Sequence, residues 1–174
     1  MNIRYCNSLI FTTFAAKFQR RPPFSLSGIM RAEVCWIHYL FIFFILKTFE
    51  ELGVSEEIRR AITELGFESP MPVQEEVIPY LLGNGNDVIA LAQTGTGKTA
   101  AYGLPLLQKI DVTRRETQAL ILSPTRELCL QIADDLKDFS KYMNGLHVVA
   151  LYGGASIETQ INSLRHGVQI IVAT

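Results

Sequence analysis

The sequence predicts an α/β fold in which a parallel sheet is covered by helices on both faces. Short, mainly apolar segments recur at residues 87–91, 119–122, 148–151 and 170–173, and amphipathic helical patterns separate them. Strands that are apolar along their whole length are typical of parallel sheets, because both of their sides are buried. In such sheets ligands bind at the carboxyl ends of the strands, where the polar motifs of this chain also fall.

Composition favours one folded domain. The chain has 174 residues, of which 48% are hydrophobic and 19% charged, so a packed core is expected rather than disorder. A net charge of −1 excludes a uniformly basic nucleic-acid coat, although a local basic strip remains compatible with it. Cys6, Cys35 and Cys129 show no C-x-x-C spacing, and we expect reduced thiols in a cytoplasmic protein.

The first 46 residues differ in character from the rest. Their apolar run, residues 36–46, has eleven residues, whereas a membrane-spanning helix needs roughly 20. No small-residue cleavage site follows the run, which argues against a signal peptide. An interfacial anchor stays the alternative, although no basic amphipathic face accompanies the run. We expect residues 1–46 to be a non-domain extension, upstream sequence read in frame, and we expect no stable membrane association.

Helix and strand signals become regular from residue 47 onward. Ser55 is expected to cap a helix that stops at Gly66, and Pro72 to open a second helix that ends near Gly83. Further helices are predicted at about 98–110, 127–142 and 156–164, between the apolar segments. Residues 47–174 are therefore interpreted as one partial domain of alternating strands and helices.

A glycine-rich segment follows the first predicted strand and opens a helix: Ala92-Gln93-Thr94-Gly95-Thr96-Gly97-Lys98-Thr99. Its spacing is that of a P-loop, with alanine in place of the first glycine. The two glycines let backbone N–H groups turn toward phosphate oxygens, and the helix start adds a positive dipole end. Lys98 supplies charge for the β- and γ-phosphates, and the Thr99 hydroxyl is an oxygen ligand for Mg²⁺. A chance glycine turn is the alternative, which the flanking strand and helix disfavour.

A second motif lies upstream: Gly66-Phe67-Glu68-Ser69-Pro70-Met71-Pro72-Val73-Gln74. Taken alone, it indicates a helix stop, a proline turn and a solvated glutamine. The chemical alternative is that the Gln74 amide, a donor beside an acceptor, pairs with N6 and N7 of adenine. Guanine presents two acceptors there, and the unpaired contact costs about 1–3 kcal/mol. A fixed Gln74 would thus select ATP over GTP.

This segment resembles the Q motif of DEAD-box ATP-dependent RNA helicases, which precedes a P-loop. The resemblance implies a RecA-like P-loop NTPase fold, incomplete at the C-terminus, with ATP and Mg²⁺ as cofactors and with Lys98 and Thr99 in catalysis. In that family an aromatic residue 17 positions before the motif's glycine stacks on the adenine, and Phe49 holds that position here. It further implies RNA-stimulated ATP hydrolysis coupled to local unwinding of RNA duplexes.

Three further segments end predicted strands. Ser123-Pro124-Thr125-Arg126-Glu127-Leu128 alone indicates a helix start, whose free N–H groups and Arg126 suit a phosphate, and Tyr152-Gly153-Gly154 alone indicates a plain turn. They resemble motif Ia and the paired-glycine motif of the same helicases, and the final threonine resembles the start of Thr-Pro-Gly-Arg. The resemblance implies contacts to the RNA backbone by Pro124, Thr125, Arg126, Glu127, Gly153, Gly154 and Thr174.

Parts of the helicase motor are not among these 174 residues. The resemblance implies a Mg²⁺-holding Asp-Glu-Ala-Asp segment and arginines from a second RecA-like domain, and such arginines contribute about 10³–10⁵ in rate. We therefore expect this chain alone to bind nucleotide weakly at best and to hydrolyse essentially none. Two classes stay open, a P-loop helicase acting on DNA and a naturally short ATP- or RNA-binding module without activity. His147 and His166 lack partners at metal spacing, so no zinc site is predicted.

Overall fold

The computed structural model describes residues 47–83 and 87–174, and the expectations for residues 1–46, Cys6 and Cys35 included, lie outside them. The helices are α2 (Glu56–Glu64), α3 (Pro72–Leu82), α4 (Lys98–Lys109), α5 (Arg126–Phe139) and α6 (Ile157–Arg165), and the strands are β1 (Ala119–Leu122), β2 (Val148–Leu151) and β3 (Ile170–Ala173). All five predicted helices and three of the four predicted strands are present. None of the described helices has the length and apolar character to span a bilayer.

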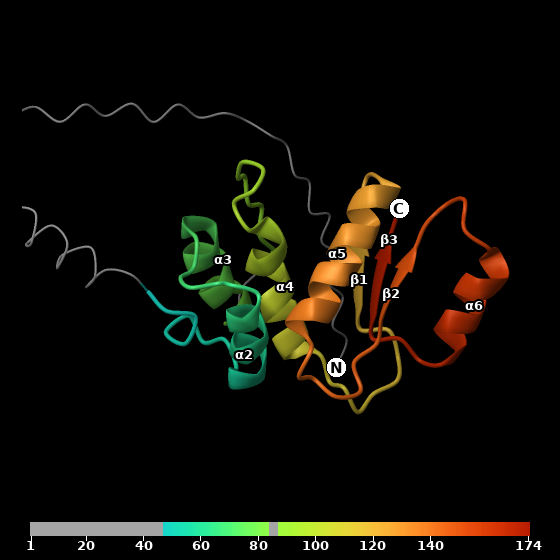
Figure 1. Cartoon of the computed structure of the whole chain (residues 1–174), viewed down its shortest axis with the longest axis horizontal. Helices are drawn as coiled ribbons and strands as arrows, with labels where there is room; N and C mark the ends of the chain where they lie inside the picture. The colour runs from blue at the N-terminus through green and yellow to red at the C-terminus, as the bar shows by residue number, and fades with distance from the viewer. Residues whose placement is uncertain (1–46, 84–86) are drawn as a thin grey trace, which may run out of the picture.

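The three strands form one parallel sheet in the order β1-β3-β2. Leu122, Ala173 and Leu151 stand level with one another at its carboxyl edge. In Figure 1 the C-terminus, which follows β3, marks that edge. Because the strands are parallel and in register, the loops that follow β1, β2 and β3 all begin at this same edge.

The core lies between one face of the sheet and α5. Ile170 and Val172 of β3 are fully buried, as is Leu136 of α5. On its other side α5 packs against α2 and α4, and α3 packs on α4, so these helices form a layer beside the sheet (Figure 1). Ile58 of α2 and Leu104 of α4 join the same buried cluster. Each such side chain contributes about 1.5–3 kcal/mol by leaving water, which is what fixes α4 next to α5.

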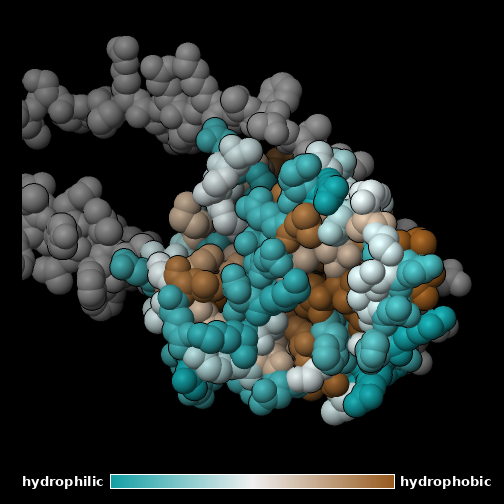
Figure 2. Space-filling view, turned by 45° about the vertical axis from the view of Figure 1, so that its right-hand side comes forward, coloured by the Kyte–Doolittle hydropathy of each residue, from teal (hydrophilic) through white to brown (hydrophobic). Residues whose placement is uncertain are grey.

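The opposite face of the sheet is covered only in part. There α6 lies on the other side of the sheet from α5 and contacts β2 (Figure 1). Leu120 and Leu122 of β1 remain 61% and 68% exposed. Apolar side chains accordingly reach the surface between hydrophilic ones (Figure 2). The expected helices on both faces are thus present, but the second layer consists of α6 alone in the described residues.

The prediction of a strand at residues 87–91 is wrong for this structure. The segment runs beside α3 and α4 with no strand assignment, and Val88 and Ala90 pack in a small apolar pocket there. Ile89 and Leu91 point outward and are 81% and 62% exposed. The side chains keep the alternation of a strand, but no neighbouring strand in the described residues exchanges backbone hydrogen bonds with them. The sequence predicts the alternation of buried and exposed side chains in this segment, but it does not reveal whether a neighbouring strand pairs with it.

Candidate functional site

The predicted phosphate loop curls into the start of α4 through two glycines. Gly95 has φ +78° and Gly97 has φ +71°, in the left-handed region that other residues rarely adopt. A Cβ at Gly97 would lie 2.3 Å from Nε2 of Gln74, whereas one at Gly95 would meet no atom within 4 Å. Glycine is therefore favoured at position 97 both by the left-handed backbone and by the lack of room for a side chain. At position 95 only the left-handed backbone favours glycine.

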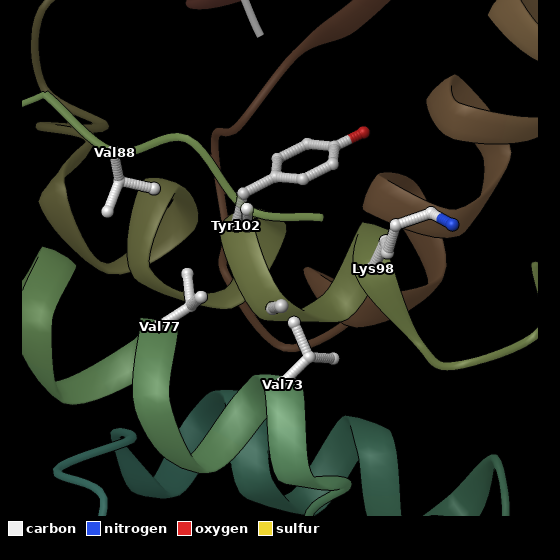
Figure 3. Close-up of a pocket in the computed structure, with 7 residues that line it drawn as sticks. Val73, Val77, Val88, Lys98 and Tyr102 are labelled. Atoms are coloured by element: carbon white, nitrogen blue, oxygen red, sulfur yellow. The ribbon is translucent and has the colours of Figure 1, made fainter. Parts of the chain in front are cut away.

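Lys98, the first residue of α4, folds back over this loop. Its Nζ donates hydrogen bonds to the carbonyl oxygens of Ala92 at 2.7 Å and Gln93 at 2.6 Å. The Thr96 hydroxyl also donates to the Gln93 carbonyl, at 2.8 Å. Figure 3 shows the Lys98 amine pointing away from Val73 of the neighbouring α3. A phosphate entering the loop would compete with these two carbonyls for the ammonium group.

Thr99 contacts a carboxylate that the sequence did not single out. Its side chain is close enough to Asp135 of α5 and Tyr102 of α4 to influence the pKa of both groups. Burial raises the pKa of Asp135, the Thr99 side chain opposes this, and the charges of Asp138 and Asp134 add to the rise. Burial and then the Asp135 charge also raise the pKa of Tyr102. No sequence motif marks position 135, because only the packing of α5 on α4 brings it there.

The residues present suit a magnesium–nucleotide complex. The loop combines left-handed glycines with a lysine, and Thr99 adds a hydroxyl one position further on. A hydroxyl and phosphate oxygens are the hard ligands that Mg²⁺ prefers. Within residues 47–83 and 87–174, no group of three or more His, Cys, Asp and Glu side chains is arranged to hold a metal ion.

Gln74 is buried, so the interpretation as a solvated glutamine is wrong. Its side chain is 1% exposed. Oε1 accepts a hydrogen bond from the Met71 backbone N–H at 2.9 Å, and Nε2 donates to the Gly97 carbonyl at 3.1 Å. The amide therefore ties the start of α3 to the phosphate loop. It retains one further N–H and one further lone pair, which are the two groups needed to read an adenine edge.

Phe49 lies in the core at 6% exposure. Its ring packs against Phe67 at 6.3 Å between centroids, and Phe67 packs edge-on against Phe139 at 5.8 Å. Phe49 and the half-buried Phe67 share a cavity of about 220 Å³ whose other lining residues are Thr48, Glu50, Arg59, Ile62, Thr63 and Glu68. Gln74 does not line this cavity. Phe67 belongs to the predicted motif, although no role was predicted for it. Its position beside Gly66 was the one sequence signal for its place in this cavity.

The residues predicted to contact RNA gather at the carboxyl edge of the sheet. The Ser123 N–H donates to the Ala173 carbonyl at 2.8 Å, and the Thr174 N–H donates to the Leu151 carbonyl at 3.1 Å. The Thr125 hydroxyl caps α5 by accepting from the Leu128 N–H at 3.3 Å, as expected for a helix start. Pro124, Glu127 and Gly153 are exposed beside them.

Arg126 reaches from the start of α5 to the loop after β2. Its guanidinium carbon lies 4.7 Å from the centroid of the Tyr152 ring. A Cβ at Gly154, which has φ +87°, would lie 3.5 Å from Nη1 of Arg126. The structure thus joins Arg126 and the paired glycines into one surface. Buried Cys129 lies behind it, with its thiol 3.3 Å from the Val172 carbonyl, and burial raises the pKa of that thiol.

Comparison with known sequences identifies the family of this chain. Residues 71–174 match the DEAD/DEAH box helicase family. Over 127 residues the chain is 53% identical to the ATP-dependent RNA helicase DeaD of Escherichia coli (strain K12). The matched segment is 73% of this chain and 20% of that protein. Identity to DeaD of Haemophilus influenzae is 50% over 127 residues, or 73% and 21% of the two chains. The chain therefore spans about one fifth of the length of these relatives.

Solved structures of DEAD-box proteins resemble the fold of this chain. A DEAD box protein from the hyperthermophile Methanococcus jannaschii aligns with a TM-score of 0.68 at 38% identity, over 73% of this chain and 34% of that one. Saccharomyces cerevisiae Dbp5 bound to RNA and ADP BeF3 aligns with a TM-score of 0.66 at 32% identity, over 74% and 32%. These similarities confirm the predicted α/β, RecA-like fold with a parallel sheet.

Proposed function

Because the chain belongs to the DEAD/DEAH box helicase family, we propose that its full-length protein is a cytoplasmic ATP-dependent RNA helicase. Residues 47–174 form the front part of its first RecA-like domain, and residues 1–46 are an extension outside that domain. The proposed activity is ATP binding and RNA-stimulated hydrolysis, coupled to local separation of short RNA duplexes. The observation that carries the proposal is the direct hydrogen bond between Gln74 and the phosphate loop at Gly97.

The phosphate loop binds the triphosphate. Backbone N–H groups from Ala92 to Thr99 face the phosphate oxygens, and the start of α4 contributes its positive dipole end. Lys98, whose Nζ donates to the carbonyl oxygens of Ala92 and Gln93, would donate to β- and γ-phosphate oxygens in their place. Thr99 would hold Mg²⁺, and the bound ion would supply charge neutralisation for the phosphates.

The base is recognised next to the loop. Gln74 already has its amide plane fixed by Met71 and Gly97, so its free N–H and lone pair are presented in one orientation. Phe49 stays the proposed stacking residue for the adenine, and it lines a cavity together with the half-buried Phe67.

RNA lies along the carboxyl edge of the sheet. Arg126 pairs with a phosphate, and the N–H groups at the start of α5 and around Gly153, Gly154 and Thr174 contact the backbone. Contacts of this kind position a strand without reading its bases, so the expected binding has little sequence preference. No stable membrane association is expected.

The test is phosphate release by the full-length protein, measured without nucleic acid, with RNA and with DNA of the same sequence. We expect stimulation by RNA, little by DNA, and loss of release in Lys98→Ala. Equal stimulation by DNA would favour a DNA-acting helicase, and RNA binding without any ATP turnover would favour a non-enzymatic module. The 174-residue chain alone should release essentially no phosphate with RNA, and release by it would contradict the proposal.

A further inference from the structure

The guanidinium group of Arg126 lies over an aromatic ring rather than against an acid. Its carbon is 4.7 Å from the centroid of Tyr152, inside the roughly 6 Å range of cation–π attraction. Within the described residues Arg126 forms no salt bridge. Its side chain is exposed, whereas Tyr152 is half-buried at the end of β2. The ring is therefore the fixed partner and the arginine the movable one.

Tyr152 is itself held by a side chain from α6. Oε1 of Gln160 accepts from the Tyr152 N–H at 3.1 Å, while Nε2 donates to the carbonyl oxygens of Tyr152 at 3.2 Å and Ala155 at 3.5 Å. One amide thus closes the loop that contains the paired glycines. This leaves the Tyr152 backbone little freedom, so its ring offers a stable surface.

The Arg126 side chain is exposed to solvent. A Cβ at Gly154 would lie 3.5 Å from its Nη1, so the glycine leaves room beside the guanidinium group. A guanidinium group presents its N–H donors at its edge and its apolar face above and below. The guanidinium carbon lies over the Tyr152 ring and no described carboxylate pairs with Arg126, so N–H donors of this group are available to a phosphate.

We propose that Tyr152 is a positioning residue that holds the Arg126 guanidinium group ready for a nucleic-acid phosphate. An unheld arginine would have to order its long side chain on binding, and Tyr152 removes part of that cost beforehand. The role belongs to the ring and not to the hydroxyl. The proposal rests on the proposed RNA binding, which it deepens at one residue.

The experiment compares Tyr152→Phe, Tyr152→Leu, Arg126→Ala and the Tyr152→Leu/Arg126→Ala pair in the full-length protein, with Tyr80→Leu on the exposed side of α3 as the matched control. The probe is a single-stranded RNA, titrated at several salt concentrations. We expect Tyr152→Phe and Tyr80→Leu to bind as the wild type does. Tyr152→Leu should bind about two- to fivefold more weakly, as one exposed cation–π contact implies. In the Arg126→Ala background, Tyr152→Leu should cause no further loss.

A second readout needs no RNA. In the nucleic-acid-free protein, the aromatic ring should shift the NMR resonance of the Arg126 Nε–Hε group upfield, both in the wild type and in Tyr152→Phe. In Tyr152→Leu the resonance should lie at the position of an ordinary exposed arginine. If Tyr152→Leu does not fold, the wild-type shift decides alone, and its absence overturns the contact.

Each outcome has one meaning. Unchanged RNA affinity in folded Tyr152→Leu overturns the positioning role, as does an equal loss in the Arg126→Ala background, because the ring would then act without the arginine. A wild-type protein that binds no RNA overturns the proposed function itself, even with the NMR shift present.

Discussion

At the residue scale, one amide joins two motifs that lie 23 positions apart in the chain. Gln74 receives a hydrogen bond from Met71 and gives one to Gly97, with its side chain almost fully buried. A buried amide in this position does two things. It fixes the entry of α3 against the phosphate loop, and it sets the orientation of the groups that would meet a base.

Replacing Gln74 tests the first of these roles. Gln74→Ala should lower the free energy of unfolding by about 1–3 kcal/mol, because the Met71 N–H and the Gly97 carbonyl lose buried partners. Gln131→Ala, an exposed glutamine of α5, is the matched control and should change it by less than about 0.5 kcal/mol. Urea denaturation provides the measurement, and equal effects of the two variants would rule out the link.

Alanine variants of the two loop glycines distinguish the effect of backbone strain from that of steric crowding. Gly95→Ala and Gly97→Ala should each cost about 1–2 kcal/mol, because both residues are left-handed. Gly97→Ala should cost more, since its Cβ would collide with the Gln74 amide. Combining Gly97→Ala with Gln74→Ala should cost less than the two losses added together, because the clash disappears. Strict additivity in urea denaturation would argue against the contact.

The position of a residue in the fold can be read from the sequence where its neighbours are adjacent in the chain. Lys98 and Thr99 follow the glycines directly, so their place in the loop needed only spacing. Asp135 and Tyr152 reach Thr99 and Arg126 through the packing of separate elements, and no local spacing reveals such contacts. A stacking residue and a core aromatic look alike in sequence, so the sequence left both open for Phe49, which is buried in this structure.

At the element scale, the end of α5 is fastened to α2 by a surface cluster. Lys141 Nζ lies 2.6 Å from Glu64, the Tyr142 hydroxyl donates to the same carboxylate, and the Arg60 guanidinium carbon lies 4.0 Å from the centroid of the Tyr142 ring. The hydrogen bonds from Lys141 and then Tyr142 lower the pKa of Glu64, and the Glu64 carboxylate raises the pKa of Lys141. Both pKa shifts favour the charged forms, so the cluster stabilises the fold while Glu64 is ionised and Lys141 is protonated.

This cluster gives stability a pH dependence. Because the Glu64 pKa is lower in the folded chain, its contribution is complete above the unfolded value of about 4.3 and is lost as pH falls through the folded value. The Lys141 contribution is complete below about 10.4 and is lost as pH rises through its raised folded value.

Glu64→Gln should therefore remove part of the loss of stability on acidification below about pH 4.3. The urea midpoint of wild type and variant should differ at neutral pH and converge in acid. Glu57→Gln, an exposed carboxylate in the first turn of α2 that has no ion pair in the described residues, should leave the profile parallel to the wild type. Parallel profiles for Glu64→Gln as well would contradict the assignment.

The open side of β1 is the weakest feature of the sheet. Leu120 and Leu122 are exposed on a strand whose outer edge has no neighbour among the described strands, and such edges promote self-association. Leu120→Thr should reduce light scattering of the concentrated chain while its unfolding free energy changes by less than about 0.5 kcal/mol. Ile121→Thr on the core-facing side should instead destabilise the chain. Unchanged scattering in Leu120→Thr would mean that β1 is not the associating edge.

Element prediction worked for segments whose pattern and partners agree. The apolar runs at β1, β2 and β3 predict strands, and their pairing supplies the hydrogen bonds that strands need. Full burial is confirmed only for alternate residues of β3, because Leu120 and Leu122 of β1 are exposed and β2 is half-buried. Residues 87–91 carry the same kind of pattern but lie against α3 and α4 instead. A strand is a property of two segments, so a single-segment pattern predicts burial and alternation better than it predicts pairing.

At the scale of the whole molecule, the two binding surfaces share one layer of helices. The phosphate loop opens α4, the Arg126 surface opens α5, and Asp135 of α5 reaches back to Thr99 of α4. The described chain spans about one fifth of its helicase relatives. In the proposed function it supplies the nucleotide cradle and the adjoining RNA-binding edge, and the remaining steps of the proposed motor belong to the full-length protein.

The proposed function depends most on an adenine-selective cradle formed by Gln74 and Lys98. The most direct measurement is a two-dimensional NMR titration of the 174-residue chain with Mg²⁺ and either ATP or GTP, following the amides of residues 92–99. We predict saturable shifts with ATP, weaker ones with GTP, and none in Lys98→Ala, whose spectrum otherwise matches the wild type. Equal responses to ATP and GTP, or shifts that persist in Lys98→Ala, would contradict the account.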